Sequence, residues 1–375
     1  MVSYFIFLTV VYAILLFGDF TRKQGYKNLN IRREVDKIGI NEGEEFNVSI
    51  IIENNKRLPI SFLLLKEIIP RGLEFFGSDI YNFNSEYNYH TSRYSILWFQ
   101  RIKRTYKYKA SKRGTYLLKE IYVDLGDIFG FYTDEKLIED YIELLVYPKL
   151  LDIKQLKLNN NSLYGDSIIR RWIYKDPLYI KGVREYNKED RMSDIHWKST
   201  LRMNKLMVKD YEYTSEFELV LILDVQCAEP YWRDVSIETV DIGVRIIASI
   251  AKQAIKEGIP VGFWTDAKIL SYRNETKREV EASLKSFKNI MELCARIDYS
   301  PNLPFNEYLM QKGKNFKTNC TYVIVTSYLS EKSLSAITLL QRAGYSIKLI
   351  DISKEGNLPT ISNIEKLTFK EEMGR

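Results

Sequence analysis

The chain has 375 residues, of which 45% are hydrophobic and 28% are charged, a composition typical of globular domains rather than of a disordered chain. Its formal net charge is only +6, from 55 basic and 49 acidic residues, so the chain lacks the concentrated charge that marks a nucleic-acid binder. This length predicts about two domains.

Three cysteines and two histidines limit the metal and redox chemistry of the chain. Cys227, Cys294 and Cys320 form no CxxC pair and are odd in number, which indicates a reducing compartment rather than a disulfide framework. A zinc site needs several histidine or cysteine ligands, and only His90 and His196 add to the cysteines. We therefore predict neither a disulfide framework nor a structural zinc ion.

An apolar segment begins the chain, and Asp19 is its first charged residue. The stretch 2–20 just reaches the length of about 20 residues that a helix needs to cross a bilayer. A cleaved signal peptide would have a basic residue before the apolar run and a small-residue cleavage site after it, and the sequence has neither. A buried core helix would be unusually uniform at this position. We predict a transmembrane anchor over 2–20.

Basic residues directly follow this segment, and such flanks stay on the cytoplasmic side of a membrane. We therefore expect a single-pass membrane protein with most of the chain in the cytoplasm. The same residues are candidates for contacts with anionic lipid head groups or nucleic acid, but the orientation signal alone explains them, and no nucleic-acid binding is expected. These residues are Arg22, Lys23, Lys27, Arg32 and Arg33.

Residues 25–148 alternate apolar and polar side chains with the period of two that is typical of half-buried strands. In GEEFNVSIIIENN, for example, Phe46, Val48 and Ile50 point to one side, and YSILWFQRI over 94–102 is interpreted as a further strand. Turn signals separate these stretches. We predict an all-β, immunoglobulin-like sandwich, in which the aromatic side chains are strand and core residues rather than a ligand site.

A connecting segment over 149–214 mixes aromatic, acidic and basic side chains closely. In a structural interpretation, Asp190 caps a helix and nearby arginines form ion pairs with carboxylates. In a catalytic interpretation, Asp190, Asp194 and His196 act as acid–base groups. The sequence sets no nucleophile against a base, which favours the structural interpretation.

Strands and helices alternate over 215–355, where FELVLILDV is typical of a parallel strand covered on both faces. Helices are predicted over 236–257, 278–296 and 332–342. This order predicts a doubly wound α/β domain, followed by a C-terminal tail over 356–375.

Asp224 ends the first predicted strand of this domain. Ligands of open α/β sheets bind outside the carboxyl ends of the strands. A carboxylate in that place is a candidate ligand for a hard divalent cation.

Short motifs mark the connecting segment between Arg184 and Arg202: REY, ED-R and DIHWK-S-T-LR, which lead to a strand ending in LILDV. Together with the stretch KRGTYLLKEIYVDLGDIFGFY over 112–132 and the terminal apolar segment, they resemble the bacterial domain of unknown function 58 family over nearly the whole chain. The residues that match the family motif, and that we predict to be interaction residues, are Arg184, Tyr186, Asp190, Arg191, Asp194, Trp197, Lys198 and Arg202.

This resemblance implies a von Willebrand factor type A-like domain after residue 215. It also implies a protein partner, because members of the family are often encoded beside MoxR-type AAA+ ATPases and work with them in assembling or maturing other proteins. The activity of the family itself is undefined, so the resemblance supplies no reaction.

The sequence departs from type A domains at the place where those domains hold a metal ion. Their motif D-x-S-x-S here keeps Asp224 but has Gln226 and Ala228 at the serine positions, and Thr326 begins the stretch in which a later aspartate is expected. Mg²⁺ demands hard oxygen ligands in near-octahedral geometry. We therefore expect Asp224 to be a vestigial metal residue, with weak or absent Mg²⁺ binding and no cofactor.

The sequence thus predicts an α+β multidomain protein with a transmembrane helix, a β-sandwich and a doubly wound α/β domain. The leading hypothesis is a membrane-anchored assembly factor that binds a MoxR-type AAA+ ATPase and is not an enzyme. The alternative is a metal-dependent hydrolase that uses Asp224 with Asp190 or Asp194, and titration with divalent cations distinguishes the two.

Overall fold

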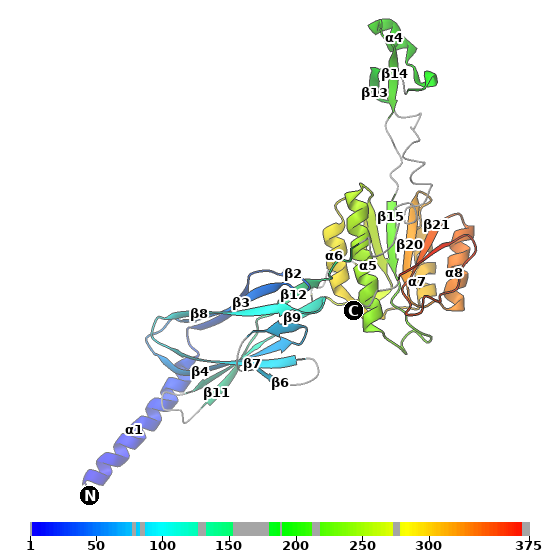
Figure 1. Cartoon of the computed structure of the whole chain (residues 1–375). Helices are drawn as coiled ribbons and strands as arrows, with labels where there is room; N and C mark the ends of the chain where they lie inside the picture. The colour runs from blue at the N-terminus through cyan, green and yellow to red at the C-terminus, as the bar shows by residue number, and fades with distance from the viewer. Residues whose placement is uncertain are drawn as a thin grey trace. The chain divides into compact units, whose positions relative to one another are not determined.

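The fold is described from a computed structural model and consists of two compact units (Figure 1). The first unit comprises Met1–Lys149 with the short segments Ile269–Thr276 and Cys294–Ile297, and the second comprises Leu150–Lys268, Lys277–Leu293 and Asp298–Arg375. The structure describes residues 2–76, 80–82, 87–126, 133–152, 180–187, 190–211, 218–272 and 278–369.

Helix α1 (Val2–Gly25) contains the apolar segment predicted to form an anchor. The span Tyr4–Gly25 has a mean hydropathy of 1.9, and 11% of its apolar window is buried within the protein. Its side chains therefore do not form a protein core, and the helix is long and apolar enough to cross a membrane.

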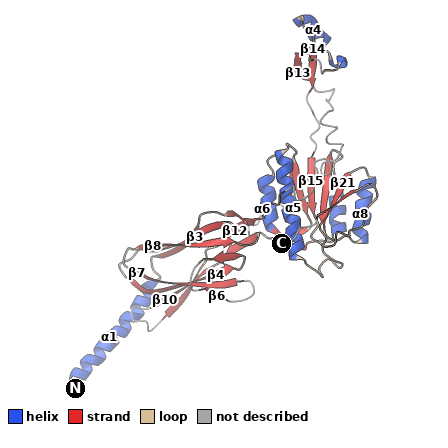
Figure 2. Cartoon of the chain, viewed as in Figure 1, coloured by secondary structure: helices blue, strands red, loops and turns tan. Residues whose placement is uncertain are grey.

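Strands make up most of the rest of the described first unit, as predicted, in four-, five- and three-stranded sheets (Figure 2). Neighbouring strands are antiparallel except for the short parallel pair β2–β12. In spatial order the sheets are β1 (Leu29–Val35), β3 (Glu45–Asn54), β8 (Arg101–Ala110) and β5 (Leu73–Phe75); β11 (Thr133–Ile138), β10 (Ile121–Gly126), β4 (Ile60–Pro70), β7 (Tyr87–Ile96) and β6 (Ile80–Asn82); and β2 (Gly39–Asn41), β12 (Ile142–Tyr147) and β9 (Gly114–Leu118).

Two apolar clusters hold these sheets together. One cluster joins side chains such as Ile50 of β3 to Leu63 of β4, so the four- and five-stranded sheets pack face to face. The other joins Phe46 of β3 and Tyr108 of β8 to Leu144 of β12. Burial of this kind stabilises a fold by roughly 25 cal/mol for each Å² of apolar surface removed from water.

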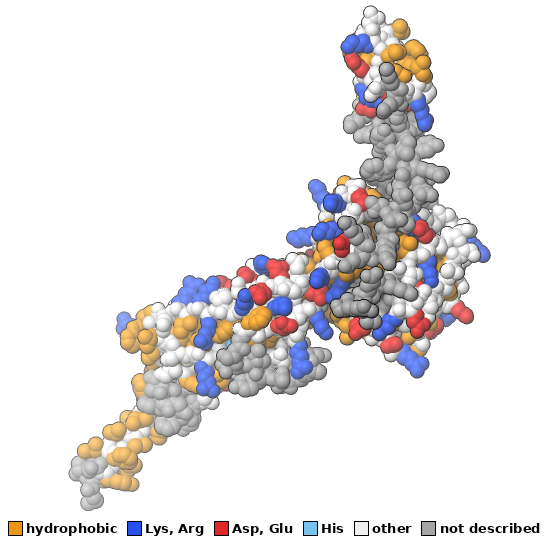
Figure 3. Space-filling model, viewed as in Figure 1, with side chains coloured by type: hydrophobic (Ala, Val, Ile, Leu, Met, Phe, Trp, Pro, Cys, Tyr) orange, Lys and Arg blue, Asp and Glu red, His pale blue; other side chains and the backbone are white. Residues whose placement is uncertain are grey.

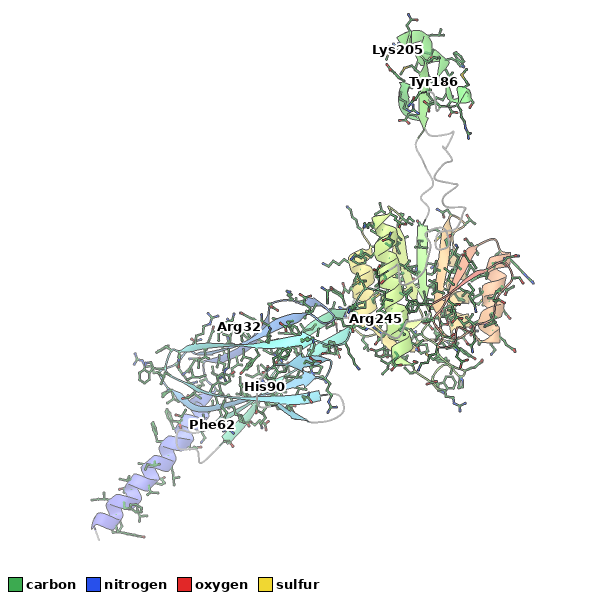
Figure 4. All side chains as sticks on the ribbon, viewed as in Figure 1. Arg32, Phe62, His90, Tyr186, Lys205 and Arg245 are labelled. Carbon is green, nitrogen blue, oxygen red and sulfur yellow. The ribbon has the colours of Figure 1, made fainter. Side chains whose placement is uncertain are left out.

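Arg33 is buried in this unit, which corrects its assignment to a basic flank open to lipid. Its Nε lies 3.1 Å from Asp140 Oδ2, and its guanidinium also approaches Glu67. Glu67 in turn lies 3.2 Å from His90 Nδ1, and the labelled His90 lies among the strands in Figure 4. Arg33 therefore links strands of the unit and is not available to a membrane surface.

The predicted strand over 94–102 is wrong, because β7 ends at Ile96 and β8 begins at Arg101. The side chain of Asn54 donates to the carbonyl oxygen of Leu97 at 2.9 Å, and Gln100 Oε1 accepts from the Leu97 N–H at 2.7 Å. The side chains of Asn54 and Gln100 thus bond to the backbone of the turn between β7 and β8. The apolar sequence over 94–102 gives no sign of this turn.

The second unit contains a six-stranded sheet whose neighbours are parallel, except for the antiparallel pair β16–β18. Its order is β18 (Glu279–Ser283), β16 (Val261–Thr265), β15 (Glu218–Leu223), β20 (Cys320–Thr326), β21 (Ser346–Asp351) and β22 (Glu365–Thr368). A further pair joins β17 (Ala267–Ile269) to β19 (Ile297–Pro301). The helices are α5 (Ile237–Lys256), α6 (Phe287–Arg296), α7 (Phe305–Lys312) and α8 (Glu331–Arg342).

Helices cover both faces of this sheet, as the prediction of a doubly wound α/β domain requires. Helices α7 and α8 share an apolar cluster with one set of strand side chains, including Ile222 and Tyr322. On α5, a Cβ added to Gly243 would meet Leu223 and Ile352, whose side chains point to the other face. The predicted ends of α5 are confirmed: the Ser236 hydroxyl caps its start, and the helix stops just before Gly258, which has a φ of +83°.

Two predicted boundaries of this unit are corrected. The helix expected over 278–296 begins only at Phe287, because 279–283 forms the edge strand β18, on which the buried Val280 faces Phe263 of β16. The tail expected from residue 356 contributes β22, which pairs in parallel with β21. In both cases hydrogen bonding to a neighbouring strand overrides the local sequence preference.

A buried ion pair fixes the segment 294–297 within the first unit. The guanidinium of Arg296 donates to both carboxylate oxygens of Glu143 at 2.6 and 3.0 Å, and each side chain is about 95% buried. Arg113 donates to the carbonyl oxygens of Cys294 and Ile297 at the end of α6, at 3.0 and 3.1 Å. The Cys294 carbonyl lies in the last turn of α6, where carbonyls lack a partner within the helix, so the arginine satisfies it.

Arg296→Met is expected to lower the free energy of unfolding by about 3 kcal/mol or more, because it leaves the buried Glu143 carboxylate without its cation. Denaturant titration of the full chain in detergent measures this change. The control is Lys317→Met at the surface pair with Glu218, where Lys317 is 58% exposed and the loss is expected to be under about 1 kcal/mol. Equal losses of unfolding free energy in both variants would contradict the assignment of Arg296 and Glu143 as a buried ion pair.

Candidate functional site

The family motif folds into a small module of its own, residues 180–211, which we call the motif module. Strand β13 (Ile180–Glu185) pairs antiparallel with β14 (Met207–Tyr211), and helix α4 (Trp197–Met203) lies between them in the chain. Ile195, Met207 and Val208 are its buried apolar side chains among the described residues. Because so few apolar side chains of the module are buried, most of its other apolar side chains remain exposed to solvent.

Helix α4 is delimited by His196 and Asn204. The Nδ1 atom of His196 accepts from the Ser199 N–H at 3.1 Å, which caps the start of the helix, and Asn204 ends it with a φ of +56°. The prediction that Asp190 caps a helix is therefore wrong. His196 carries a structural role in this site, and its ring nitrogen is occupied by the backbone.

Asp190 instead closes the loop that precedes the helix. Its carboxylate accepts two bonds from the Arg184 guanidinium, at 2.7 and 2.5 Å, and one from the Asn187 N–H at 2.9 Å. The backbone N–H of Tyr186 donates to the carbonyl oxygen of Leu206 at 2.9 Å, which ties this loop to β14. Bidentate arginine–carboxylate pairs fix geometry, so Arg184, Tyr186 and Asp190 form the frame of the module.

The module leaves large apolar side chains exposed beside cations. Trp197 and Leu201, four residues apart on α4, are 64% and 82% exposed. Figure 3 shows hydrophobic side chains gathered on one side of the module, with basic and acidic side chains elsewhere on it. We use the name α4 face for the exposed large apolar side chains of the module together with its exposed cations. The apolar side chains are Met192, Trp197, Leu201, Met203 and Leu206, and the cations are Arg191, Lys198 and Arg202.

The structure therefore divides the predicted interaction residues into two groups. Arg191, Trp197, Lys198 and Arg202 are exposed, whereas Arg184, Tyr186 and Asp190 form the frame. Of these three, Tyr186 and Asp190 are half-buried and Arg184 is exposed. Asp194 ends a short 3₁₀ helix, where its carboxylate accepts from Ser193 Oγ at 3.2 Å. Leu201 is not among the predicted interaction residues, although its spacing of four from Trp197 places the two side chains on one side of a helix.

A second candidate site lies at the carboxyl edge of the six-stranded sheet, where Asp224 follows β15 and Asp266 follows β16. Their side chains are almost completely buried. Asp224 accepts from Thr326 Oγ1 at 2.8 Å and from the Gln226 N–H at 2.9 Å, and Asp266 Oδ1 accepts from the Val225 N–H at 3.0 Å. Asp266 Oδ2 is buried without a hydrogen-bond partner.

Burial shifts the titration of both carboxyl groups. It raises the pKa of Asp224 well above its usual range, and the nearby Asp266 charge adds to this shift. Burial also raises the pKa of Asp266 to about 7. The pair therefore retains a proton near neutral pH, since two charged carboxylates in one buried site repel each other.

The groups around this pair serve the fold. The Gln226 amide donates to the carbonyl oxygen of Ala228 at 3.0 Å and accepts from the Phe305 N–H, at the start of α7, at 3.1 Å. Within the described part of the chain, no group of three or more His, Cys, Asp or Glu side chains is placed to hold a metal ion. Asp266 is not among the predicted site residues, although it follows an apolar strand just as Asp224 does.

Comparison with known proteins supports the family resemblance. The model of the family described as "Protein of unknown function DUF58" matches residues 182–362, which confirms the resemblance over that part of the chain. The chain is also similar to the "Uncharacterized protein YeaD" of Bacillus subtilis (strain 168), with 21% identity over 338 residues that cover 89% of this chain and 78% of that protein.

Two solved structures are similar to about a third of the chain. The CARDB domain of the PF1109 protein from Pyrococcus furiosus, solved in complex with di-metal ions, has 10% identity and a TM-score of 0.20, and the match covers 32% of this chain and 91% of that one. A cohesin module from a Clostridium perfringens family 33 glycoside hydrolase has 10% identity and a TM-score of 0.22, covering 31% and 96%.

Asp266→Asn is expected to change how stability depends on pH. The native carboxyl holds a proton that the unfolded chain releases, so its contribution falls as pH rises from about 4 to about 7. The slope is at most about 1.4 kcal/mol per pH unit for this group. The variant should therefore gain stability relative to the parent as pH rises from 5 to 8.

Denaturant titrations at several pH values measure this difference. The control is Asp234→Asn, because Asp234 is exposed in the same unit and its profile should run parallel to that of the parent. A parallel profile for Asp266→Asn as well would show that this carboxyl has an ordinary pKa.

Proposed function

We propose that this chain is a membrane-anchored protein-binding or assembly factor that acts with a MoxR-type AAA+ ATPase and has no catalytic activity of its own. The observation that carries the proposal is the α4 face, the exposed large apolar side chains and cations of a module with its own frame. The partner itself follows from the family resemblance, and the surface supports binding by a protein.

The chemistry of the α4 face suits a protein partner. Exposed tryptophan, leucine and methionine side chains gain free energy when a partner removes them from water. Tryptophan and arginine also dominate binding energy at protein interfaces. The exposed cations Arg191, Lys198 and Arg202 would then face acidic groups on the rim of the partner surface.

We further propose that the α/β unit is von Willebrand factor type A-like and that the first unit is an immunoglobulin-like sandwich. Numbered along the chain from β15, with β17 and β19 omitted because they form a separate pair, the sheet has the order 3-2-1-4-5-6 of doubly wound folds. The third of these strands, β18, is the antiparallel one. The face-to-face sheets of the first unit support the second assignment.

The proposed orientation places the units in the cytoplasm. Lys23 and Lys27 are exposed directly after the apolar part of α1. Positive residues that flank a membrane span favour the cytoplasmic side. The three cysteines are free, which suits a reducing compartment.

Trp197→Ala combined with Leu201→Ala is expected to weaken partner binding by at least about tenfold, because each truncation removes an anchor worth more than about 1 kcal/mol. Tagged full-length protein is purified in detergent with its partners from native cells, with and without ATP, and the partners are quantified by mass spectrometry. An AAA+ ATPase whose amount changes with nucleotide is the expected partner.

A matched control is Leu339→Ala on α8, because Leu339 is also exposed but lies outside the motif module. This variant should retain the partner. Equal recovery of the ATPase by all proteins would exclude the α4 face as its binding surface, and the absence of any nucleotide-dependent ATPase would contradict the proposed partner.

The second candidate function is a metal-dependent hydrolase centred on Asp224. The unpartnered Oδ2 of Asp266 beside it is the observation that favours this candidate. Asp190, its proposed helper, is instead held by Arg184. We expect calorimetric titration with Mg²⁺ or Mn²⁺ to give no saturable binding below about 1 mM. Tighter binding that Asp224→Ala abolishes would favour the hydrolase.

A further inference from the structure

The turn between β7 and β8 presents three consecutive large apolar side chains to solvent. Leu97, Trp98 and Phe99 are 55%, 60% and 64% exposed. Hairpin turns are usually built from small or polar residues such as glycine, asparagine and aspartate. We call these three residues the apolar turn.

Phe99 adopts a backbone conformation that a bulky residue rarely takes, with a φ of +51°. Hydrogen bonds to the adjoining turn between β3 and β4 keep Phe99 in this strained conformation. The N–H of Phe99 donates to the carbonyl oxygen of Lys56 at 3.2 Å, and Asn54 binds the Leu97 carbonyl oxygen. A strained residue whose side chain is exposed gains no stability from burial, which points to a function outside the fold.

The same β3–β4 turn contacts the end of α1. The N–H of Asn55 donates to the carbonyl oxygen of Asn28 at 2.8 Å. The Lys56 ammonium donates to the carbonyl oxygens of Gly25 and Lys27, the latter at 2.8 Å, and thus caps the helix. A single turn therefore joins the apolar turn to the place where α1 leaves the apolar span (Figure 1).

Close packing fixes the end of α1 against the sheets. A Cβ built on Gly25 would lie 2.4 Å from the Leu125 side chain of β10, so the helix end and the strand are in direct contact. Figure 3 shows hydrophobic side chains at the end of the β-strands next to α1. The apolar turn thus lies at the level of the last turn of the helix rather than at the far end of the strands.

Cations surround this region of the first unit. Lys27 follows the helix and Arg57 follows the capping Lys56, and both side chains are exposed. Tryptophan and phenylalanine at the edge of a bilayer, with basic residues beside them, are the combination that binds the head-group region of an anionic membrane.

We propose that the apolar turn is a second membrane anchor, which inserts into the head-group region of the same anionic bilayer that α1 crosses. This inference rests on the membrane anchoring proposed above. Continuity with α1 and the adjacent cations identify the lipid bilayer as the surface that covers these side chains. Together the helix and the turn hold the first unit in a fixed orientation to the membrane.

The test uses the full chain reconstituted into vesicles of phosphatidylcholine and phosphatidylglycerol. Part of the phosphatidylcholine carries bromine atoms near the head-group end of its acyl chains, where they quench tryptophan emission. We expect quenching in the parent, a clear loss of the quenchable emission in Trp98→Phe, and no loss in the control Trp232→Phe, because Trp232 is an exposed tryptophan of the other unit. Unchanged quenching in Trp98→Phe would overturn the proposal.

Extraction of the same vesicles with alkaline carbonate distinguishes a failure of the apolar turn as an anchor from a failure of α1 as the membrane span. Retention of the protein, with Trp98 still accessible to an aqueous quencher, overturns the role of the turn but leaves the anchor α1 intact. Release of the protein overturns both.

Phe99→Gly distinguishes a membrane role from a folding role. Glycine relieves the positive φ, so the detergent-solubilised variant should melt at an equal or higher temperature than the parent. In vesicles, the quenching of Trp98 should decrease because the neighbouring apolar group is lost. A lower melting temperature with unchanged quenching would show that Phe99 serves the fold.

Discussion

The removal of large apolar side chains from water is the physical requirement on which this structure depends. The apolar clusters within the two units satisfy it internally. Helix α1, the apolar turn and the α4 face leave such side chains outside those clusters. We infer that a bilayer covers the first two and a protein partner covers the third, so the same requirement that folds the units also directs what they bind.

Buried charge follows a second requirement, that each ion needs a partner. Arg33 of β1 and Arg296 at the end of α6 meet carboxylates inside the first unit, and these pairs link the elements that carry them. Asp224 and Asp266 instead lie beside each other. Burial raises their pKa values, so a retained proton lowers the charge of the pair. This pair therefore lies where ligands of open α/β sheets usually bind. The neighbouring amide of Gln226 and hydroxyl of Thr326 are hydrogen-bonded within the fold.

The sequence predicted those helix and strand ends that are set by residues next to them in the chain. The ends of α5 were predictable because Ser236 and Gly258 act on the backbone next to them. Edge strand β18 was not, because its pairing with β16 depends on a distant segment. The approach of Asp266 to Asp224 likewise depends on strand order, and the exposure of Leu201 depends on how little core the motif module needs. Patterns in sequence identify candidate side chains, whereas tertiary contacts decide which of them remain exposed.

Photo-crosslinking in native cells tests the central claim most directly. A photoreactive amino acid replaces Leu201 on the α4 face in one full-length protein and Leu339 on α8 in another, and crosslinked partners are identified by mass spectrometry. We predict a crosslink from position 201 to an AAA+ ATPase and none to that protein from position 339. Crosslinks to lipid alone at position 201, or the same ATPase at both positions, would contradict the assignment of the α4 face as the partner-binding surface.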